Sequence, residues 1–349
     1  MVEKLSDEEL RYYSRQIVMT DMGYNAQLKL KGSKVCLVGV GGLGSPASMQ
    51  LAAMGVGFLR IVDRDFVELT NLHRQHLYSV DDVGVPKVEA AAKRLRRLNP
   101  YITVESLPLS VSEANAEDLV RGMDVVVDGL DSMAARYAIN RACIKLGVPY
   151  VFGAAITTNG NLSTIVPGET ACLECFYGGL DDKKLPKCGV VGVHPSLVNI
   201  IASLEVSEAI RILVGRKPRL ANKLLHFDLD EMEFNEIMLQ KVESCPVCGS
   251  SPSGSPMPLR QELVEEICGR KGKKVFVVVP EKSMDINLLE VKNYLKKKRY
   301  SLTVEAELGL TFVLGDVKAS ILKSGITILE GLKEKEGARK LFNELTGSC

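Results

Sequence analysis

Short apolar runs alternate with stretches of helical periodicity over the first two thirds of the chain. Apolar, β-branched runs predict strands at residues 35–40, 58–62, 103–107, 124–128, 150–155 and 160–166. Helical spacing predicts helices at residues 45–54, 85–98, 134–146 and 195–214, and a capping box of Ser6 and Glu9 predicts one more, running through residue 18. Alternating strands and helices are typical of a mostly parallel sheet with helices on both faces. We therefore predict an α/β fold with a Rossmann-like, doubly wound sheet.

The pattern changes after residue 214. Polar-alternating runs at 224–228 and 233–239 predict a hairpin, and residues 250–258, SSPSGSPMP, have the composition of a flexible linker. Residues 259–349 predict a small α+β domain with helices at 285–299, capped by Asp285, and 334–345, and strands at 273–279, 302–307, 310–314, 319–322 and 326–329. We therefore divide the chain into a large domain, residues 1–249, the linker and a small C-terminal domain.

Residues 33–65 form one unbroken unit of strand, glycine loop, helix and strand. Gly39, Gly41, Gly42 and Gly44 have the spacing Gly-x-Gly-x-x-Gly, which lets backbone amides and a helix N-terminus approach a phosphate. Asp63 ends the second strand, where an acid can accept a hydrogen bond from a ribose hydroxyl. The alternative is a glycine turn that only packs a helix on a strand. Because the whole unit is in order, we interpret it as a nucleotide site, which NAD and ATP would satisfy equally.

Basic and amide side chains follow at the same predicted sheet edge. The segment LTNLHRQHL, residues 69–77, offers Asn71, Arg74 and Gln75 to phosphates, and the planar guanidinium of Arg74 suits them best. Lys87 lies close to the positive end of a predicted helix, where it can also meet a phosphate.

Four further residues are candidates whose role depends on context. Asp128 and Asp131 follow the fourth strand, and one of them can hold magnesium. Arg15 shares a helix face with the arginine four residues before it, which by itself predicts a solvated face. Cys188 lies in a glycine-containing, charged segment that predicts a mobile loop. Its thiol is available for chemistry or is an incidental small residue, because the sequence does not give the thiolate pKa.

Nine cysteines, an odd number, in a large chain without an export signal favour metal or thiol chemistry over a disulfide framework. Cys172 and Cys175 form one Cys-x-x-Cys pair, and Cys245 and Cys248 form a second in a CPVCG knuckle. Two such pairs complete a tetrahedral zinc site. The alternatives are two unrelated pairs or a redox pair, but the knuckle sequence favours structural zinc.

The composition narrows the classes of partner. A net charge of +1 gives no global attraction to nucleic acid or to an anionic membrane. The N-terminus has no apolar signal core, and no apolar run approaches the length of a membrane span, so we predict a cytoplasmic protein.

Taken together, these motifs resemble the ubiquitin-activating-like adenylyltransferases of the MoeB/ThiF/HesA type. The resemblance covers roughly residues 5–249. It is carried by RYYSRQ, GVGGLGSP, IVDRDFVELTNLHRQ, VGVPKVEA, DGLDS, the two Cys-x-x-Cys pairs and SLEVSEAI, in this order and spacing.

The resemblance implies that ATP fills the glycine loop and that Asp63 holds its ribose. Asn71, Arg74 and Lys87 would line the phosphates, and Asp131 would coordinate Mg²⁺. The family's arginine at the position of Arg15 reaches the nucleotide of the other subunit, which implies a homodimer with composite active sites. The implied substrate is a ubiquitin-like β-grasp carrier protein with a C-terminal Gly-Gly, whose carboxylate becomes an acyl-adenylate as pyrophosphate leaves.

Two features extend this expectation. Cys188 falls in the crossover loop, where such proteins often carry a cysteine that takes the activated acyl group, before a downstream acyl acceptor receives it. By loose analogy with the eukaryotic enzymes, the C-terminal domain would dock the carrier or that acceptor. We find in it no cysteine in a phosphate-cradling loop of the kind that sulfurtransferase domains of some relatives carry.

Three other interpretations stay open. A carrier-independent enzyme of the same superfamily would adenylate a small or tRNA-linked carboxylate. An NAD-dependent dehydrogenase is permitted by the glycine loop, but it does not require the set of phosphate-facing residues. A noncatalytic scaffold has no use for that set either.

Overall fold

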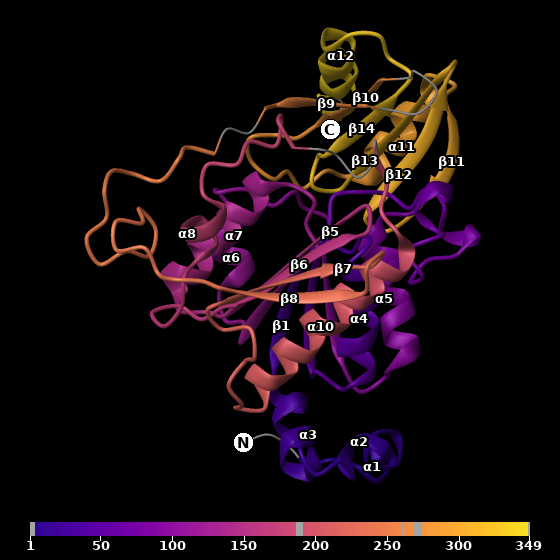
Figure 1. Ribbon diagram of the computed structural model, residues 1–349. Helices are drawn as coiled ribbons and strands as arrows, with labels where there is room; N and C mark the ends of the chain where they lie inside the picture. The colour runs from indigo at the N-terminus through magenta and orange to yellow at the C-terminus, as the bar shows by residue number, and fades with distance from the viewer. Residues whose placement is uncertain (1–3, 186–190, 260–261, 269–273, 348–349) are drawn as a thin grey trace.

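The computed structural model describes residues 4–185, 191–259, 262–268 and 274–347 of the 349-residue chain. Its strands form two separate sheets, one of eight strands and one of six (Figure 1). No described helix combines the length and the apolar character needed to cross a membrane.

The large sheet is parallel over five strands and antiparallel over the rest. Its order is β3-β2-β1-β4-β5-β6-β7-β8. The parallel strands are β1 (Lys34–Val38), β2 (Phe58–Val62), β3 (Thr103–Leu107), β4 (Val125–Asp128) and β5 (Tyr150–Ile156); β6 (Asn159–Ile165), β7 (Lys223–Asp228) and β8 (Glu233–Met238) extend the sheet antiparallel. The predicted mostly parallel sheet is confirmed.

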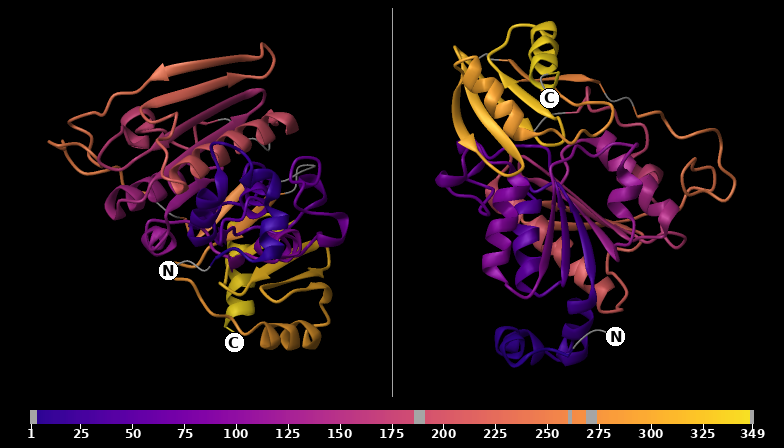
Figure 2. Two further views of the ribbon diagram at one scale, coloured as in Figure 1. Left: turned by 90° about the horizontal axis from the view of Figure 1, so that it is seen from below. Right: turned by 180° about the vertical axis from the view of Figure 1, so that it is seen from behind.

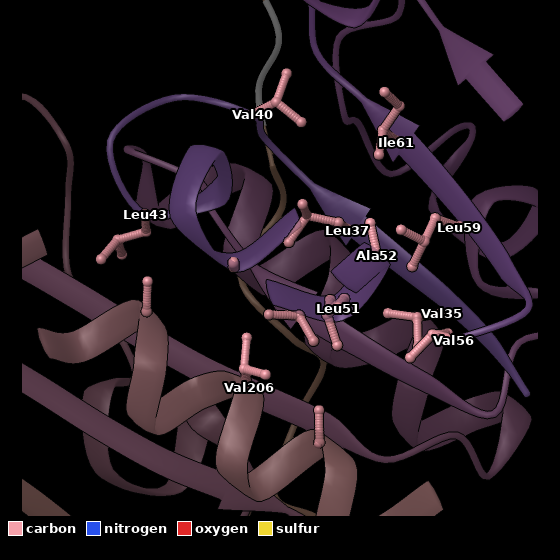
Figure 3. Close-up of a cluster of buried hydrophobic side chains, with 14 of the residues drawn as sticks. Val35, Leu37, Val40, Leu43, Leu51, Ala52, Val56, Leu59, Ile61 and Val206 are labelled. Atoms are coloured by element: carbon pink, nitrogen blue, oxygen red, sulfur yellow. The ribbon is translucent and has the colours of Figure 1, made fainter. Parts of the chain in front are cut away.

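Helices cover both faces of this sheet, as the doubly wound prediction requires (Figure 2). The helices α4 (Gly44–Ala53), α5 (Lys87–Leu98) and α10 (Pro195–Leu213) share one apolar core, and α6 (Ala116–Val120), α7 (Met133–Leu146) and α8 (Leu173–Tyr177) share the core on the other face. Figure 3 shows the first core, where Leu51 of α4 lies between Leu37 of β1 and Val206 of α10. Burial of these side chains fixes the glycine loop, which leads directly into α4.

The N-terminal segment departs from the predicted single helix. It forms α1 (Asp7–Tyr12), α2 (Ser14–Ile17) and α3 (Gly23–Gly32). The capping box of Ser6 and Glu9 is present, but the helix breaks at Tyr13, which is only 4% exposed and whose hydroxyl accepts from Asn99 Nδ2 at 2.8 Å. Tertiary anchoring of this one side chain therefore overrides the local helical pattern.

The C-terminal sheet is antiparallel throughout, in the order β11-β12-β13-β14-β10-β9. Its strands are β9 (Val264–Cys268), β10 (Lys274–Val278), β11 (Ser301–Glu305), β12 (Gly309–Leu314), β13 (Val317–Leu322) and β14 (Thr327–Glu330), and α11 (Leu288–Lys297) and α12 (Lys335–Thr346) close its core. The α+β prediction is confirmed, although β9 was missed. The predicted cap Asp285 is wrong: Asn287 caps α11, accepting from the backbone N–H of Leu289.

The C-terminal domain and the N-terminal helices lie at opposite ends of the large sheet (Figure 1). Phe66, just beyond the carboxyl end of β2, packs in one apolar cluster with Val277, Val279, Leu322 and Ile326 of the C-terminal domain. The domain therefore has its own core and also a second apolar cluster shared with the carboxyl edge of the large sheet.

Candidate nucleotide-binding site and metal centre

The glycine loop sits between β1 and β4, at the point where the strand order reverses. Parallel α/β sheets bind ligands at this place, beyond the carboxyl ends of the strands. Gly39 has φ +88°, and a Cβ built on it would lie 2.3 Å from the carbonyl oxygen of Gly129; a Cβ on Gly44 would lie 1.9 Å from the carbonyl oxygen of Gly39. Packing of the protein alone therefore demands glycine at positions 39 and 44.

Gly41 and Gly42 differ from these two. A Cβ on Gly41 would come no closer than 3.8 Å to another atom, and one on Gly42 no closer than 3.5 Å. The protein's own packing leaves room for a side chain there, so an approaching ligand explains both glycines better. Beside them, Gln75 is 3% exposed and its Oε1 is buried with no hydrogen-bond partner among the described residues. An unpaired buried acceptor beside a glycine loop that leads into a helix N-terminus suits a nucleotide.

Asp63 connects the second strand to the glycine loop. Its carboxylate accepts from the backbone N–H groups of Val40 and Asp65, both at 2.8 Å. Burial raises the pKa of this carboxyl group, and the Lys87 ammonium partly opposes that rise. Since each carboxylate oxygen has a second lone pair, Asp63 has the capacity to accept a further hydrogen bond.

Lys87 is brought to the same edge and is almost fully buried, with 5% exposed. Its ammonium donates to the carboxylate of Asp65 at 2.8 Å. Burial by itself would lower the pKa of Lys87, but the carboxylates of Asp65 and Asp63 raise it above its usual value. The lysine is therefore a fixed cation at the edge, with further N–H donors for a phosphate.

The structure places Arg74 beside the glycine loop. A Cβ on Gly42 would lie 4.0 Å from Nε of Arg74, whose Nη1 donates to the carbonyl oxygen of Thr70 at 3.0 Å. Asn71 is half-buried, and its Oδ1 accepts from the backbone N–H of Glu68 at 3.0 Å. That bond uses the side-chain carbonyl oxygen of Asn71, and the side-chain NH₂ group is the hydrogen-bond donor of this residue.

The structure separates Asp128, the last residue of β4, from Asp131 on the loop after it. Asp128 is fully buried; it accepts from Arg136 Nε at 3.0 Å, from the Tyr150 hydroxyl and from the backbone N–H of Leu130. Its carboxylate is committed to this network. Asp131 is exposed on the following loop and is the one of the pair that a metal ion can reach.

The four predicted metal ligands come together from two distant segments. The sulfur atoms of Cys172, Cys175, Cys245 and Cys248 lie within 4.8 Å of one another. The closest pairs are 3.4–3.9 Å apart, and a tetrahedron with Zn–S bonds of about 2.3 Å has edges of about 3.8 Å. The hydrogen bond from the thiol of Cys172 lowers the pKa of Cys175. The donor set fits a structural zinc site.

A family model described as the ThiF family matches residues 13–247. The chain belongs to the ThiF family. It is 38% identical over 270 residues to the sulfur carrier protein adenylyltransferase of Thermus thermophilus, covering 75% of this chain and 97% of that protein. The SAMP-activating enzyme E1 of Haloferax volcanii is 38% identical over 250 residues, which is 71% of this chain and 92% of that one. The predicted resemblance is thereby confirmed.

Two further comparisons bear on the rest of the chain. The adenylyltransferase and sulfurtransferase MOCS3 of Culex quinquefasciatus is 32% identical over 343 residues, 98% of this chain and 77% of that protein. A crystal structure of E. coli MccB with ATP superposes with a TM-score of 0.61 and 27% identity, covering 68% of this chain and 74% of that one. The C-terminal domain lies beyond the ThiF family model, which ends at residue 247.

The structure does not bring Arg15 to this site within one chain. Arg15 is exposed on α2, in the N-terminal segment, where neighbouring Gln16 donates to the Met54 carbonyl oxygen at the end of α4 opposite the glycine loop. Cys188 lies outside the described residues.

Sequence reasoning missed three residues of this edge. Tyr78 donates its hydroxyl to the carbonyl oxygen of Val40 at 2.8 Å and so fixes the glycine loop. Asp65 holds Lys87, and Arg64 forms an ion pair with Glu265 of the C-terminal domain at 2.9 Å. The alternation Asp63-Arg64-Asp65 directly after a strand was a usable signal for Asp65, whereas nothing local indicated the partner of Arg64.

Proposed function

We propose that the protein is an adenylyltransferase that uses ATP to adenylate the C-terminal Gly-Gly carboxylate of a ubiquitin-like β-grasp carrier protein, releasing pyrophosphate. The observation that carries the proposal is the pairing of an open glycine loop, at Gly41 and Gly42, with the buried cation Lys87 at the same sheet edge. The named activities of the Thermus and Haloferax relatives support the same enzyme class and carrier substrate.

In this reaction the ribose binds to Asp63 and the phosphates lie against the glycine loop. The carrier carboxylate is already ionised at neutral pH, so its attack on the α-phosphate needs no general base. The chain's contribution is alignment and charge neutralisation, with Lys87 and Arg74 on the phosphate oxygens and Asn71 as an amide donor. Asp65 keeps the Lys87 ammonium at the edge before ATP arrives.

Two metals complete the proposal. Asp131 would hold Mg²⁺, which would supply charge neutralisation for the leaving pyrophosphate. The four cysteines would hold Zn²⁺, which would tie the end of the large domain, at Cys245 and Cys248, to the N-cap residue Cys172 and to Cys175 of α8. Zinc with four cysteine ligands has no open position and is therefore structural.

The remaining assignments extend the proposal beyond one chain. Arg15 completes the site of the partner subunit in a cytoplasmic homodimer, which is consistent with its exposure at the end of the molecule away from its own glycine loop. Cys188 takes the activated acyl group from the adenylate as a thioester, with AMP as the leaving group, before a downstream acceptor receives it.

The test is exchange of labelled pyrophosphate into ATP, with the diglycine-ended β-grasp proteins of the source organism supplied one at a time. We expect one carrier to support exchange and its diglycine-deleted form to fail. Exchange without any carrier would replace this proposal with the carrier-independent alternative, and tight NAD binding without ATP binding would replace it with a dehydrogenase.

A further inference from the structure

The C-terminal domain touches the large domain through the loop that holds Asp63 and Asp65. Arg64 lies between these acids; it pairs with Glu265 of β9 at 2.9 Å and donates to Ser110 Oγ at 3.2 Å. The side chains of Arg64 and Glu265 are 26% and 31% exposed, so the pair is partly shielded from water. Arg64 therefore joins the loops after β2 and β3 to the edge strand of the C-terminal sheet.

The segment that carries Lys87 is held in the same way. Both carboxylate oxygens of Glu89 accept backbone N–H groups of the C-terminal domain, from Glu307 at 3.1 Å and from Leu308 at 2.8 Å. Three residues before Lys87, the carbonyl oxygen of Gly84 accepts from Thr311 Oγ1 at 2.8 Å. The C-terminal domain thus fixes the chain on both sides of the buried lysine.

The two domains also pack closely through apolar and backbone atoms. Phe66 is 7% exposed within the apolar cluster that the two domains share. A Cβ on Gly309 would lie 3.0 Å from Cγ of Pro86 and 3.1 Å from Cε1 of Phe66, and a Cβ on Gly84 would lie 2.7 Å from Cγ2 of Val304. The two surfaces interlock at backbone distance, which a loosely tethered docking module would not need.

We propose that the C-terminal domain is part of the nucleotide site, and that Glu265 is a positioning residue that acts through Arg64 on the Asp63–Asp65 loop. This inference rests on the proposed function, because it takes the ligand of this edge to be ATP. A loop that is already ordered loses less conformational entropy when ATP binds, so the affinity is higher. The domain thereby acts in ATP binding, and not only in recruiting a partner.

The test uses the full-length protein and measures the Kd for ATP by calorimetry without carrier, together with the melting temperature. Glu265→Gln is expected to raise the Kd about two- to fivefold, the range expected for a partly exposed ion pair. Glu265→Asp and the exchange Arg64→Glu with Glu265→Arg are expected to restore part of the affinity. Glu266→Gln is the matched control, because its carboxylate pairs at 3.0 Å with Lys274 within the C-terminal sheet.

In carrier-dependent exchange, the KM for ATP is expected to rise in Glu265→Gln with kcat retained. An unchanged Kd in Glu265→Gln, or an equal loss in Glu266→Gln, would overturn the inference and leave the proposed function standing. A wild-type protein that binds no ATP would instead refute the proposed function.

Discussion

The ammonium of Lys87 lies 2.8 Å from the carboxylate of Asp65, and only 5% of the lysine is exposed. Burial of a cation that pairs with one carboxylate of the Asp63–Asp65 loop carries a desolvation penalty, so we expect this lysine to have a role beyond the ion pair. In the proposed reaction its task is to neutralise phosphate charge.

Replacement of Lys87 should therefore impair catalysis. Lys87→Met is expected to lower carrier-dependent pyrophosphate exchange by about 10²–10³-fold, as for loss of one preorganised donor to developing charge. Lys93→Met in the same helix is the control, because Lys93 is exposed. Equal exchange rates in the two variants would remove Lys87 from the site.

The two kinds of glycine in the loop should respond differently to a methyl group. Gly44→Ala is expected to destabilise the fold by about 1–3 kcal/mol or more, because its Cβ would lie 1.9 Å from a backbone oxygen. Gly41→Ala should melt like the wild type and bind ATP at least about tenfold more weakly, or ~1.4 kcal/mol. Unchanged ATP affinity in Gly41→Ala would show that no ligand approaches there.

Substitution of Asp128 should affect the stability of the fold, whereas substitution of Asp131 should affect the use of Mg²⁺. Asp128→Asn leaves Arg136 without its buried carboxylate and is expected to cost about 3–5 kcal/mol of unfolding free energy in a denaturant titration. Asp131→Asn should leave that free energy unchanged and shift the Mg²⁺ dependence of exchange to higher concentration. The reverse pattern would exchange the two roles.

The sequence alone does not distinguish the roles of Asp128 and Asp131. Both aspartates lie at or just beyond the end of the same strand, and only the structure shows that Asp128 faces Arg136 and Tyr150 while Asp131 stays exposed. The glycine loop and the cysteine pairs were predictable because each is a local pattern with one geometry. The break at Tyr13 and the Arg64–Glu265 pair were not, because each depends on a side chain far away in the sequence.

Buried Glu205 should make stability depend on pH. Both its carboxylate oxygens lack a hydrogen-bond partner among the residues that the structure describes, and burial, with Asp128 nearby, raises its pKa well above the usual value. The unfolded chain releases this proton near pH 4.3, so the stability contribution is full below that pH and is lost as pH rises towards the folded-state pKa.

Glu205→Gln removes this ionisation. The variant is expected to melt above the wild type at pH 8, with a difference that shrinks towards pH 4.5. Glu208→Gln is the contrast: Glu208 accepts from Thr164, Arg219 and Leu220, so its replacement should destabilise across the range. A wild-type advantage at pH 8 over Glu205→Gln would mean that the carboxylate is ionised and paired.

The cysteine cluster predicts that bound zinc stabilises the fold. Cys245→Ser is expected to lose bound zinc, measured by mass spectrometry, and a loss of about 3 kcal/mol would lower Tm by roughly 6–12 °C. Cys143→Ser is the control, because Cys143 is equally buried but lies outside the cluster. Full zinc content in Cys245→Ser would contradict the assignment.

In the proposed reaction the adenylyl group of ATP, which contains the α-phosphate, is transferred to the carrier carboxylate. The most direct measurement supplies the cognate carrier with ATP labelled at the α- or the γ-phosphate and isolates the carrier by rapid acid quench. We expect label on the carrier from α-labelled ATP alone, and none on its diglycine-deleted form. Label from γ-labelled ATP, or none from either while ATP binds, would contradict it.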